Sequence, residues 1–203
     1  FNYGVYRKQI EDMDAYIFYL QGREKLHSSH DLDVMKTSKQ LFERAIEIDP
    51  DFSRAFAGIC KAELRTYEIT NNTEDFEAAK SACTRAEALA PGLNTEINIA
   101  LGKLYRYRGW YPQAIEKLEQ AIAVSPGAVD AYIELAETVA KTNDKERSEA
   151  LLLRAIDLKR NYWKAYESLA SFYYRSERYR ESADAYEVST SLTPDGAAGF
   201  AAK

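Results

Sequence analysis

The sequence predicts an all-α protein built from stacked pairs of helices, and three observations support this fold class. Only nine of the 203 residues are glycine and five are proline, so few positions interrupt a helix. Apolar residues recur at helical spacing in segments such as residues 42–48 and 114–124. A short phrase also recurs along the chain at a nearly constant interval, which is typical of repeated structural units.

The recurring phrase sets the period of the repeat. It reads FERAIEIDP at 42–50, CTRAEALAP at 83–91, LEQAIAVSP at 118–126, LLRAIDLKR at 152–160 and YEVSTSLTP at 186–194. Successive starts are 41, 35, 34 and 34 residues apart (83−42, 118−83, 152−118 and 186−152). An array with this period consists of stacked supersecondary units, so we expect one helical hairpin in each period.

The third period contains the residues that are expected to begin and end the two helices of one hairpin. Leu101 and Tyr105 lie at i and i+4 of an amphipathic segment, and Gly109 interrupts that segment. Pro112 suits the first turn of a second helix, and Pro126 ends that helix. Small residues within the phrase predict that the two helices of a pair approach closely.

These positions resemble the tetratricopeptide repeat (TPR) family, whose unit is a helix-turn-helix of 34 residues. The third repeat carries the family's pattern most fully, at Leu101, Gly102, Tyr105, Ala114, Leu118, Ala121 and Pro126. The sequence departs from the pattern at Arg160, which replaces a proline, and at Glu63, which replaces an aromatic residue. The resemblance implies a right-handed superhelical solenoid of about five repeats.

The repeats are expected in order along residues 14–194, at about 14–51, 52–92, 93–127, 128–161 and 162–195. Residues 1–13 are expected to form an N-terminal lead-in segment, and residues 196–203 the start of a further helix or a cap. The first two periods are longer than 34 residues. Because surface turns absorb insertions cheaply, we expect two protruding turns, around His27–Val34 and Asn71–Glu74.

Composition and motifs exclude several classes of function. The net charge of −5 disfavours nucleic acid as a partner. No apolar run reaches the length of a membrane span, and no signal peptide opens the sequence. Signatures of phosphate loops, nucleophile elbows and zinc helices are absent, so we expect no enzyme, no cofactor and no metal. His27 and His30 are interpreted as part of a solvated turn, with a metal shared with Asp31 or Asp33 as the alternative.

Two residue types have packing interpretations. Cys60 and Cys83 are too few for a disulfide framework and lack metal spacing, so small core hydrophobes are the favoured interpretation. A disulfide between them is left open. Most of the fifteen tyrosines, including Tyr186, fall at packing positions of the repeat, whereas Tyr107 and Tyr174 do not.

The TPR resemblance implies that the first helices of the pairs line a concave groove that binds a protein or peptide. The predicted groove residues are Arg54, Lys61, Arg65, Ile99, Lys103, Arg106, Tyr107, Ile133, Glu137 and Tyr174. Their five cations form a basic patch beside Tyr107, which predicts an acidic or carboxylate-ended peptide, with a solvated charged face as the alternative. The Lys and Asn clamp of repeats that bind chaperone tails is not present at the equivalent positions.

The leading functional hypothesis is a non-enzymatic scaffold for protein interaction. Residues 14–23 and 51–58 also resemble the C-terminal TPR regions of bacterial regulatory proteins, which follow cyclase, kinase or DNA-binding output domains. That resemblance implies, as an alternative, a regulatory or sensory domain of a larger signalling protein. A third hypothesis is self-association into a homo-oligomer. We expect a cytoplasmic location, or a periplasmic one if the chain belongs to a membrane-anchored regulator.

Overall fold

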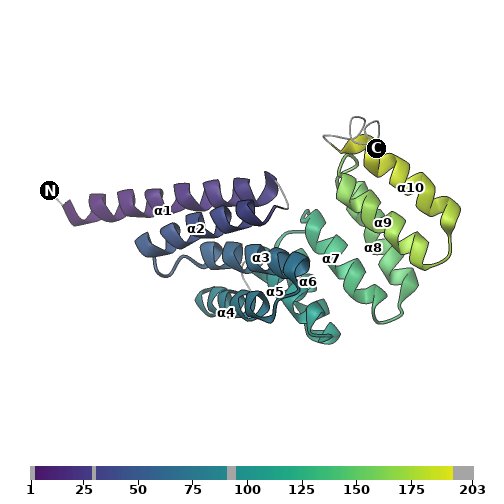
Figure 1. Ribbon diagram of the computed structural model, residues 1–203, viewed down its shortest axis with the longest axis horizontal. Helices are drawn as coiled ribbons and strands as arrows, with labels where there is room; N and C mark the ends of the chain where they lie inside the picture. The colour runs from purple at the N-terminus through teal and green to yellow at the C-terminus, as the bar shows by residue number, and fades with distance from the viewer. Residues whose placement is uncertain (1–2, 29–30, 91–94, 194–203) are drawn as a thin grey trace. The chain divides into compact units, whose positions relative to one another are not determined.

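The computed structural model describes residues 3–28, 31–90 and 95–193, with side chains from residue 13 onward except at 27 and 28. This part of the chain contains ten α-helices and no strand (Figure 1). The predicted all-α fold is therefore confirmed. The chain divides into two compact units, Phe1–Leu104 (unit 1) and Tyr105–Lys203 (unit 2).

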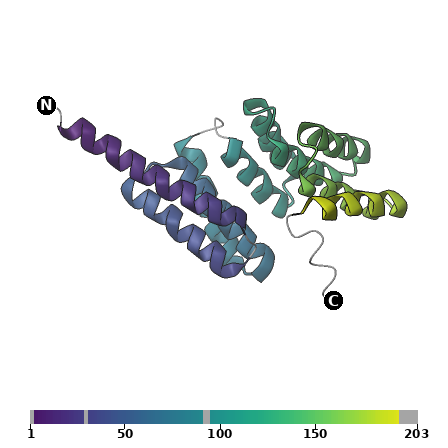
Figure 2. The same ribbon diagram turned by 90° about the horizontal axis from the view of Figure 1, so that it is seen from above.

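Unit 1 is a layered stack of helices. It contains α1 (Tyr3–Ser28), α2 (Leu32–Ile48), α3 (Ser53–Thr70), α4 (Thr73–Leu89) and the larger part of α5 (Thr95–Tyr107). Helix α1 packs on α2, α2 on α3 and α3 on α4, so each helix lies beside its neighbour in sequence (Figure 2). The first turns of α1 extend past the end of α2 (Figures 1 and 2). Helix α1 thus already includes most of the expected lead-in segment.

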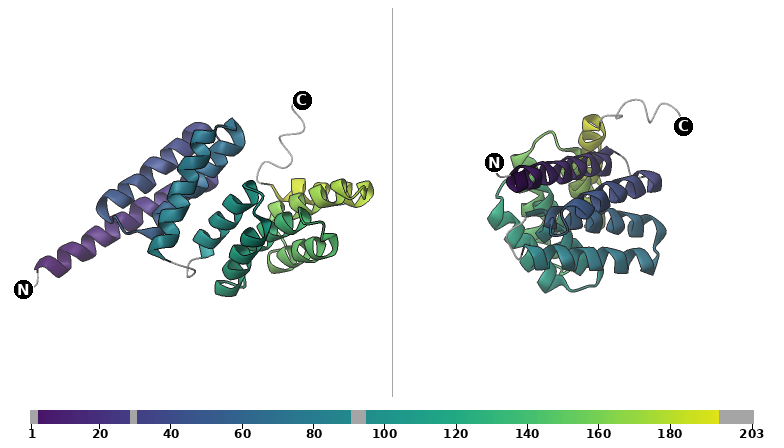
Figure 3. Two further views of the ribbon diagram at one scale, coloured as in Figure 1. Left: turned by 90° about the horizontal axis from the view of Figure 1, so that it is seen from below. Right: turned by 90° about the vertical axis from the view of Figure 1, so that its left-hand side faces the viewer.

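Unit 2 repeats the same arrangement with shorter helices. It contains α6 (Tyr111–Val124), α7 (Val129–Ala140), α8 (Lys145–Leu158), α9 (Trp163–Arg175) and α10 (Tyr179–Leu192). Each of these helices packs on the next, as the green and yellow ribbons of Figure 3 show. Pro112 lies in the first turn of α6, as predicted. Helix α8 ends at Leu158 although Arg160 replaces the proline, because the backbone leaves the helical conformation at Lys159 (φ −149°, ψ 86°).

The prediction of two protruding turns is wrong. Helix α3 continues to Thr70 and α4 begins at Thr73, so only Asn71 and Asn72 connect them. Asn71 adopts a left-handed conformation (φ 52°), and the Asn72 side chain caps α4 by accepting the Glu74 N–H. The additional residues lengthen the helices instead, since α3 and α4 have 18 and 17 residues whereas α9 and α10 have 13 and 14.

The first long turn is shorter than expected for the same reason, because α1 continues to Ser28 and α2 begins at Leu32. The Asp31 side chain caps α2 by accepting the Asp33 N–H. The alternative of a metal held by His27 and His30 falls on side chains outside the described residues.

In three repeats a serine forms a hydrogen bond between the two helices of a pair. It lies four residues before the recurring phrase. These serines are Ser38, Ser148 and Ser182, and all three are buried. Their hydroxyls donate to the carbonyl oxygens of Gly22 (2.7 Å), Ala136 (2.9 Å) and Ala170 (2.9 Å) on the first helix of the same pair. The other two repeats have alanine at this position, so hydroxyl and methyl groups both fit the close contact.

Replacing Ser148 by alanine is expected to lower the free energy of unfolding by about 1 kcal/mol, because a buried hydrogen bond between α7 and α8 is lost. Ser191→Ala is the matched control, since Ser191 is exposed and bonds only Val188 of its own helix. Both variants gain the same helix propensity, so their difference in urea unfolding isolates the interhelical bond. Equal stability of the two variants would contradict the assignment.

Phe42 of α2 fills the narrowest contact in unit 1. Its buried ring lies between two glycines, Gly22 of α1 and Gly58 of α3. A methyl group at Gly22 would lie 2.8 Å from the ring, and one at Gly58 would lie 2.5 Å from it. Glycine at these two positions therefore permits the close approach of three successive helices.

The two cysteines are joined as a disulfide between α3 and α4. Cys60 and Cys83 are both buried, and their Cα atoms are 5.2 Å apart. The favoured interpretation as separate core hydrophobes is therefore wrong, and the alternative left open is correct. The pair arises because Cys60 occupies the repeat position of Gly102 and Cys83 that of Leu118, where the helices of a pair lie closest.

Candidate functional site

The predicted groove residues lie on the first helices of the pairs, and the structure commits several of them to internal contacts. In unit 1 the Lys103 ammonium on α5 lies 2.8 Å from Glu68 Oε1 on α3. The Arg65 guanidinium on α3 donates to the Leu26 carbonyl at the end of α1. These two cations therefore tie neighbouring first helices together.

Glu96 bridges α5 and α1 on the same side of unit 1. Its carboxylate accepts a hydrogen bond from the Tyr19 hydroxyl at 2.9 Å and lies 3.9 Å from the Arg23 guanidinium. Burial, followed by the charge of Glu96, raises the pKa of Tyr19 to about 12, so this hydroxyl stays protonated at neutral pH. Ile99, predicted to face a ligand, is only 9% exposed and is therefore buried rather than open to a ligand.

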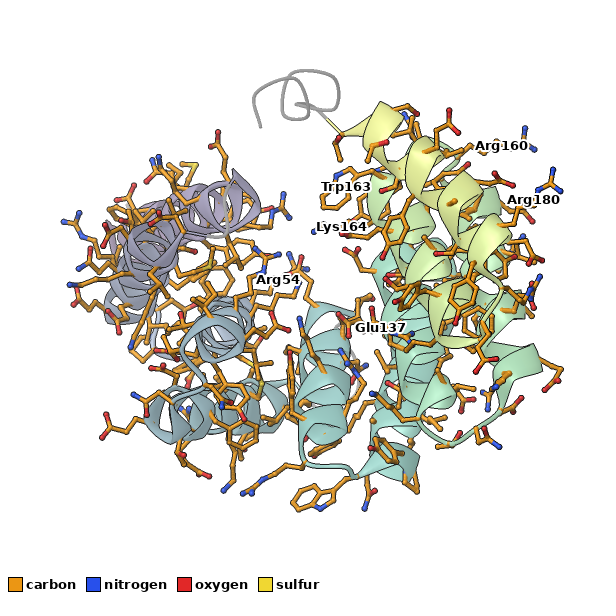
Figure 4. All side chains as sticks on the ribbon, turned by 45° about the vertical axis from the view of Figure 1, so that its right-hand side comes forward. Arg54, Glu137, Arg160, Trp163, Lys164 and Arg180 are labelled. Carbon is orange, nitrogen blue, oxygen red and sulfur yellow. A yellow bond between two sulfur atoms is a disulfide. The ribbon has the colours of Figure 1, made fainter. Side chains whose placement is uncertain are left out.

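Two predicted cations of unit 1 remain outside such contacts. Arg54 is exposed at the start of α3 (Figure 4), and Lys61 is half-buried two turns further along. Neither forms an ion pair with any described residue. The basic patch of unit 1 is therefore smaller than the sequence predicts.

Arg106 forms an internal ion pair in unit 2. Its Nη2 lies 2.7 Å from Glu134 Oε2 and 3.1 Å from Glu137 Oε2, both on α7. The guanidinium also lies 5.4 Å from the ring centroid of Tyr107. Burial opposes the charge of Arg106, but the two carboxylates outweigh it and the pKa lies above its ordinary value. The side chain is only 14% exposed, so its predicted role as an open cation is corrected.

Ile133 on α7 belongs to the core of unit 2. It is 7% exposed and packs with the fully buried Ala155 and Ala165. The prediction that it faces a ligand is therefore wrong, because the first helix of the following pair covers it. Glu137, labelled in Figure 4, accepts a hydrogen bond from Ser168 at 3.4 Å in addition to its contact with Arg106.

Tyr174 is the predicted groove residue that the structure leaves most open. It is 63% exposed, and its ring lies 5.6 Å from that of Tyr179, which is 60% exposed, in an edge-to-face arrangement. Tyr186 is also exposed, two turns along α10 from Tyr179, and its hydroxyl lies 3.0 Å from Ser171 Oγ. We call Tyr174, Tyr179 and Tyr186 the tyrosine patch.

From its repeat position Tyr186 was predicted to lie in the core, and Tyr179 was not predicted to have a role. At the repeat position of Tyr186, Leu152 is buried because α9 packs against it through Leu169. No described helix follows α10, so Tyr186 has no such cover in the described part of the chain. Tyr179 could have been noticed from its place directly after the turn that follows Tyr174.

Neither a metal site nor a membrane span is found in the described residues. No group of three or more His, Cys, Asp or Glu side chains among them could hold a metal ion. None of the described helices is long and apolar enough to cross a membrane.

Comparison with known proteins identifies the repeat. Residues 99–162 match a family model described as tetratricopeptide repeat. This segment of the chain carries tetratricopeptide repeats. The match extends from α5 through α8 and so covers most of the third TPR unit and the fourth.

Solved structures of other TPR proteins have the same fold. TTC0263, a thermophilic TPR protein in Thermus thermophilus, matches with a TM-score of 0.70 at 19% identity, over 96% of this chain and 97% of that one. The pilF protein of Pseudomonas aeruginosa matches with a TM-score of 0.65 at 16% identity, over 94% and 86%. YrrB, described as a TPR protein with an unusual peptide-binding site, matches with a TM-score of 0.51 at 15% identity, over 80% of each chain.

At these identities the likeness shows the fold, and the predicted helical repeat solenoid is confirmed. No curated relative matches the chain. The TPR fold supports a scaffold for protein interaction, a role in which stacked repeats present extended surfaces. The narrower resemblance of residues 14–23 and 51–58 to bacterial regulatory proteins stays a prediction.

Proposed function

We propose that this TPR chain is a scaffold that binds a segment of a partner protein, with Tyr174 near the end of α9 and Tyr179 at the start of α10 as anchors. The observation that carries the proposal is the exposure of two adjacent tyrosine rings on unit 2. Exposed aromatic pairs are uncommon on solvated surfaces, and tyrosine is enriched among the residues that contribute most to binding. A ring with a hydroxyl supplies both apolar contact and a hydrogen bond.

The charged residues support a secondary role in this binding. Arg106 and Lys103 are held by carboxylates of their neighbouring helices, so a partner would have to displace an existing ion pair to reach them. Arg175 is exposed directly beside Tyr174. An acidic residue in the partner segment would meet Arg175 without that cost, so the aromatic contact supplies affinity and the charge supplies preference.

A peptide-display selection against the full chain tests the proposal. Tyr174→Ala is expected to weaken the selected peptides at least about tenfold, as truncation of a central aromatic contact does. Trp110→Ala is the matched control, because Trp110 is a similarly exposed aromatic residue in the turn between α5 and α6. Peptides that bind wild type and Tyr174→Ala equally, or that lose binding only with Trp110→Ala, would contradict the proposed surface.

We further propose a periplasmic or other oxidising location for this scaffold. The supporting observation is the buried disulfide between Cys60 and Cys83, since disulfides persist in oxidising compartments and are rare in the cytosol. This favours the alternative of a membrane-anchored regulator over the cytoplasmic expectation.

A further inference from the structure

Two hollows lie along unit 1 between α2 and α4, with α3 as their floor. One has a volume of about 320 Å³ and the other of about 500 Å³. Lys39 of α2 and Glu63 of α3 line both of them, so this pair separates two parts of one groove. The groove is distinct from the tyrosine patch, which belongs to unit 2.

The ion pair of Lys39 and Glu63 at the centre of the groove includes a buried carboxylate. Glu63 is 5% exposed, and its Oε1 lies 2.5 Å from the Lys39 ammonium. The contact with Glu63 holds the pKa of Lys39 above its ordinary value. The two charges therefore offset each other at the centre of the groove, so neither is left to attract an occupant of opposite charge.

The equivalent place in unit 2 holds a tyrosine ring. In the repeat register, Tyr173 of α9 corresponds to Glu63 of α3, and Glu149 of α8 corresponds to Lys39 of α2. There the Tyr173 hydroxyl donates to Glu149 Oε1 at 2.9 Å. Unit 1 therefore has a carboxylate and open space where unit 2 has a phenol ring.

A guanidinium also adjoins both places. In unit 2 the Arg178 guanidinium lies 4.2 Å from the centroid of the Tyr173 ring. In unit 1 Arg85 lines the larger hollow and lies 5.9 Å from the ring centroid of Phe56. The larger hollow thus combines a guanidinium that contacts an aromatic ring, and that is itself paired with Asp51 at 3.2 Å, with an acceptor at Glu63.

We propose that the groove beside Lys39 and Glu63 binds a small neutral aromatic molecule that carries a hydrogen-bond donor, such as a phenol. Its ring would lie on Phe56, Ile59 and Ala82, which line the larger hollow. Its donor would point to Glu63, because a carboxylate accepts several hydrogen bonds and Lys39 contacts Oε1.

Titration of the full chain with 4-methylphenol, followed by amide NMR, tests this site. Shifts are expected at residues of α2, α3 and α4 around Glu63, and toluene, which has no donor, is expected to bind at least about tenfold more weakly. Benzoate serves as a charged probe. If 4-methylphenol causes no saturable shifts at this groove, the site is disproved. If toluene or benzoate binds as well as 4-methylphenol, the assigned ligand class is wrong.

A double variant, Lys39→Glu with Glu63→Tyr, separates loss of the site from loss of the fold. It recreates the Tyr173 and Glu149 pair of unit 2, so the variant is expected to fold while its own ring fills the hollow. Binding of 4-methylphenol should fall at least about tenfold, and Tyr174→Ala should leave it unchanged. Undiminished binding to a folded double variant would overturn the proposal. Because the readout lies on unit 1, its failure leaves the proposed function of the tyrosine patch standing.

Discussion

Reduction of the disulfide between Cys60 and Cys83 is expected to lower the free energy of unfolding by about 3 kcal/mol. The bond closes a loop with a sequence separation of 23 residues across α3 and α4. In the chain-entropy account, closing such a loop restricts the unfolded chain and stabilises the folded one by roughly that amount. Urea unfolding followed by circular dichroism, with and without a reductant, measures the difference.

The double variant Cys60→Ala with Cys83→Ala is the control for this prediction. Its unfolding midpoint is expected to be low and insensitive to the reductant, since no bond remains to reduce. Alkylation and mass measurement establish that the wild-type thiols are fully reduced in the test sample. A wild-type midpoint that does not change on complete reduction would contradict the stabilising role of the bond.

Alanine at Gly58 is expected to lower the free energy of unfolding by roughly 1–3 kcal/mol. The added methyl group would lie 2.5 Å from Cζ of Phe42, well inside contact distance. The ring cannot swing away, because Gly22 of α1 closes its other side at a distance that already excludes a methyl group. The overlap must therefore be relieved by moving α2 or α3.

Two further variants isolate the steric cause. Gly127→Ala adds a methyl group where no atom lies within 4 Å, so its unfolding midpoint is expected to stay close to that of wild type. Combining Gly58→Ala with Phe42→Leu shortens the obstructing side chain and is expected to cost less than the sum of the two single changes. Strictly additive losses would argue against a clash between these two residues.

The recurring phrase made the helix pairs predictable because each repeat has to bury the same face against its neighbours. The period placed Pro112 inside α6 and the small residues in and just ahead of the phrase inside the core, and Ala121 and Ala114 are indeed fully buried. The repeat register places the two cysteines where the helices of a pair approach closely, but it does not show whether their sulfur atoms are bonded.

The candidate surface was less predictable than the fold. The repeat register indicates which face a residue occupies, but not which carboxylate reaches it from the next first helix. Lys103 and Arg106 were therefore predicted to be open cations, although Glu68 and Glu134 hold them. For Tyr186 the error was the opposite one: it was predicted to be buried but is exposed. Burial at its repeat position depends on a following helix rather than on the residue type.

The longer repeats of unit 1 indicate by how many residues a repeat can be lengthened without disturbing the packing of the array. An α-helix turns by about 100° for each residue, so two residues added to one helix would rotate its buried face by about 200° into solvent. Roughly seven residues shared by both helices of a pair amount to about two turns in all, so the buried faces return close to their original direction. The period of 41 is 34 plus such a step, which leaves Phe42 still facing Gly58. Repeats of this chain can thus change height in whole turns while their stacking stays the same.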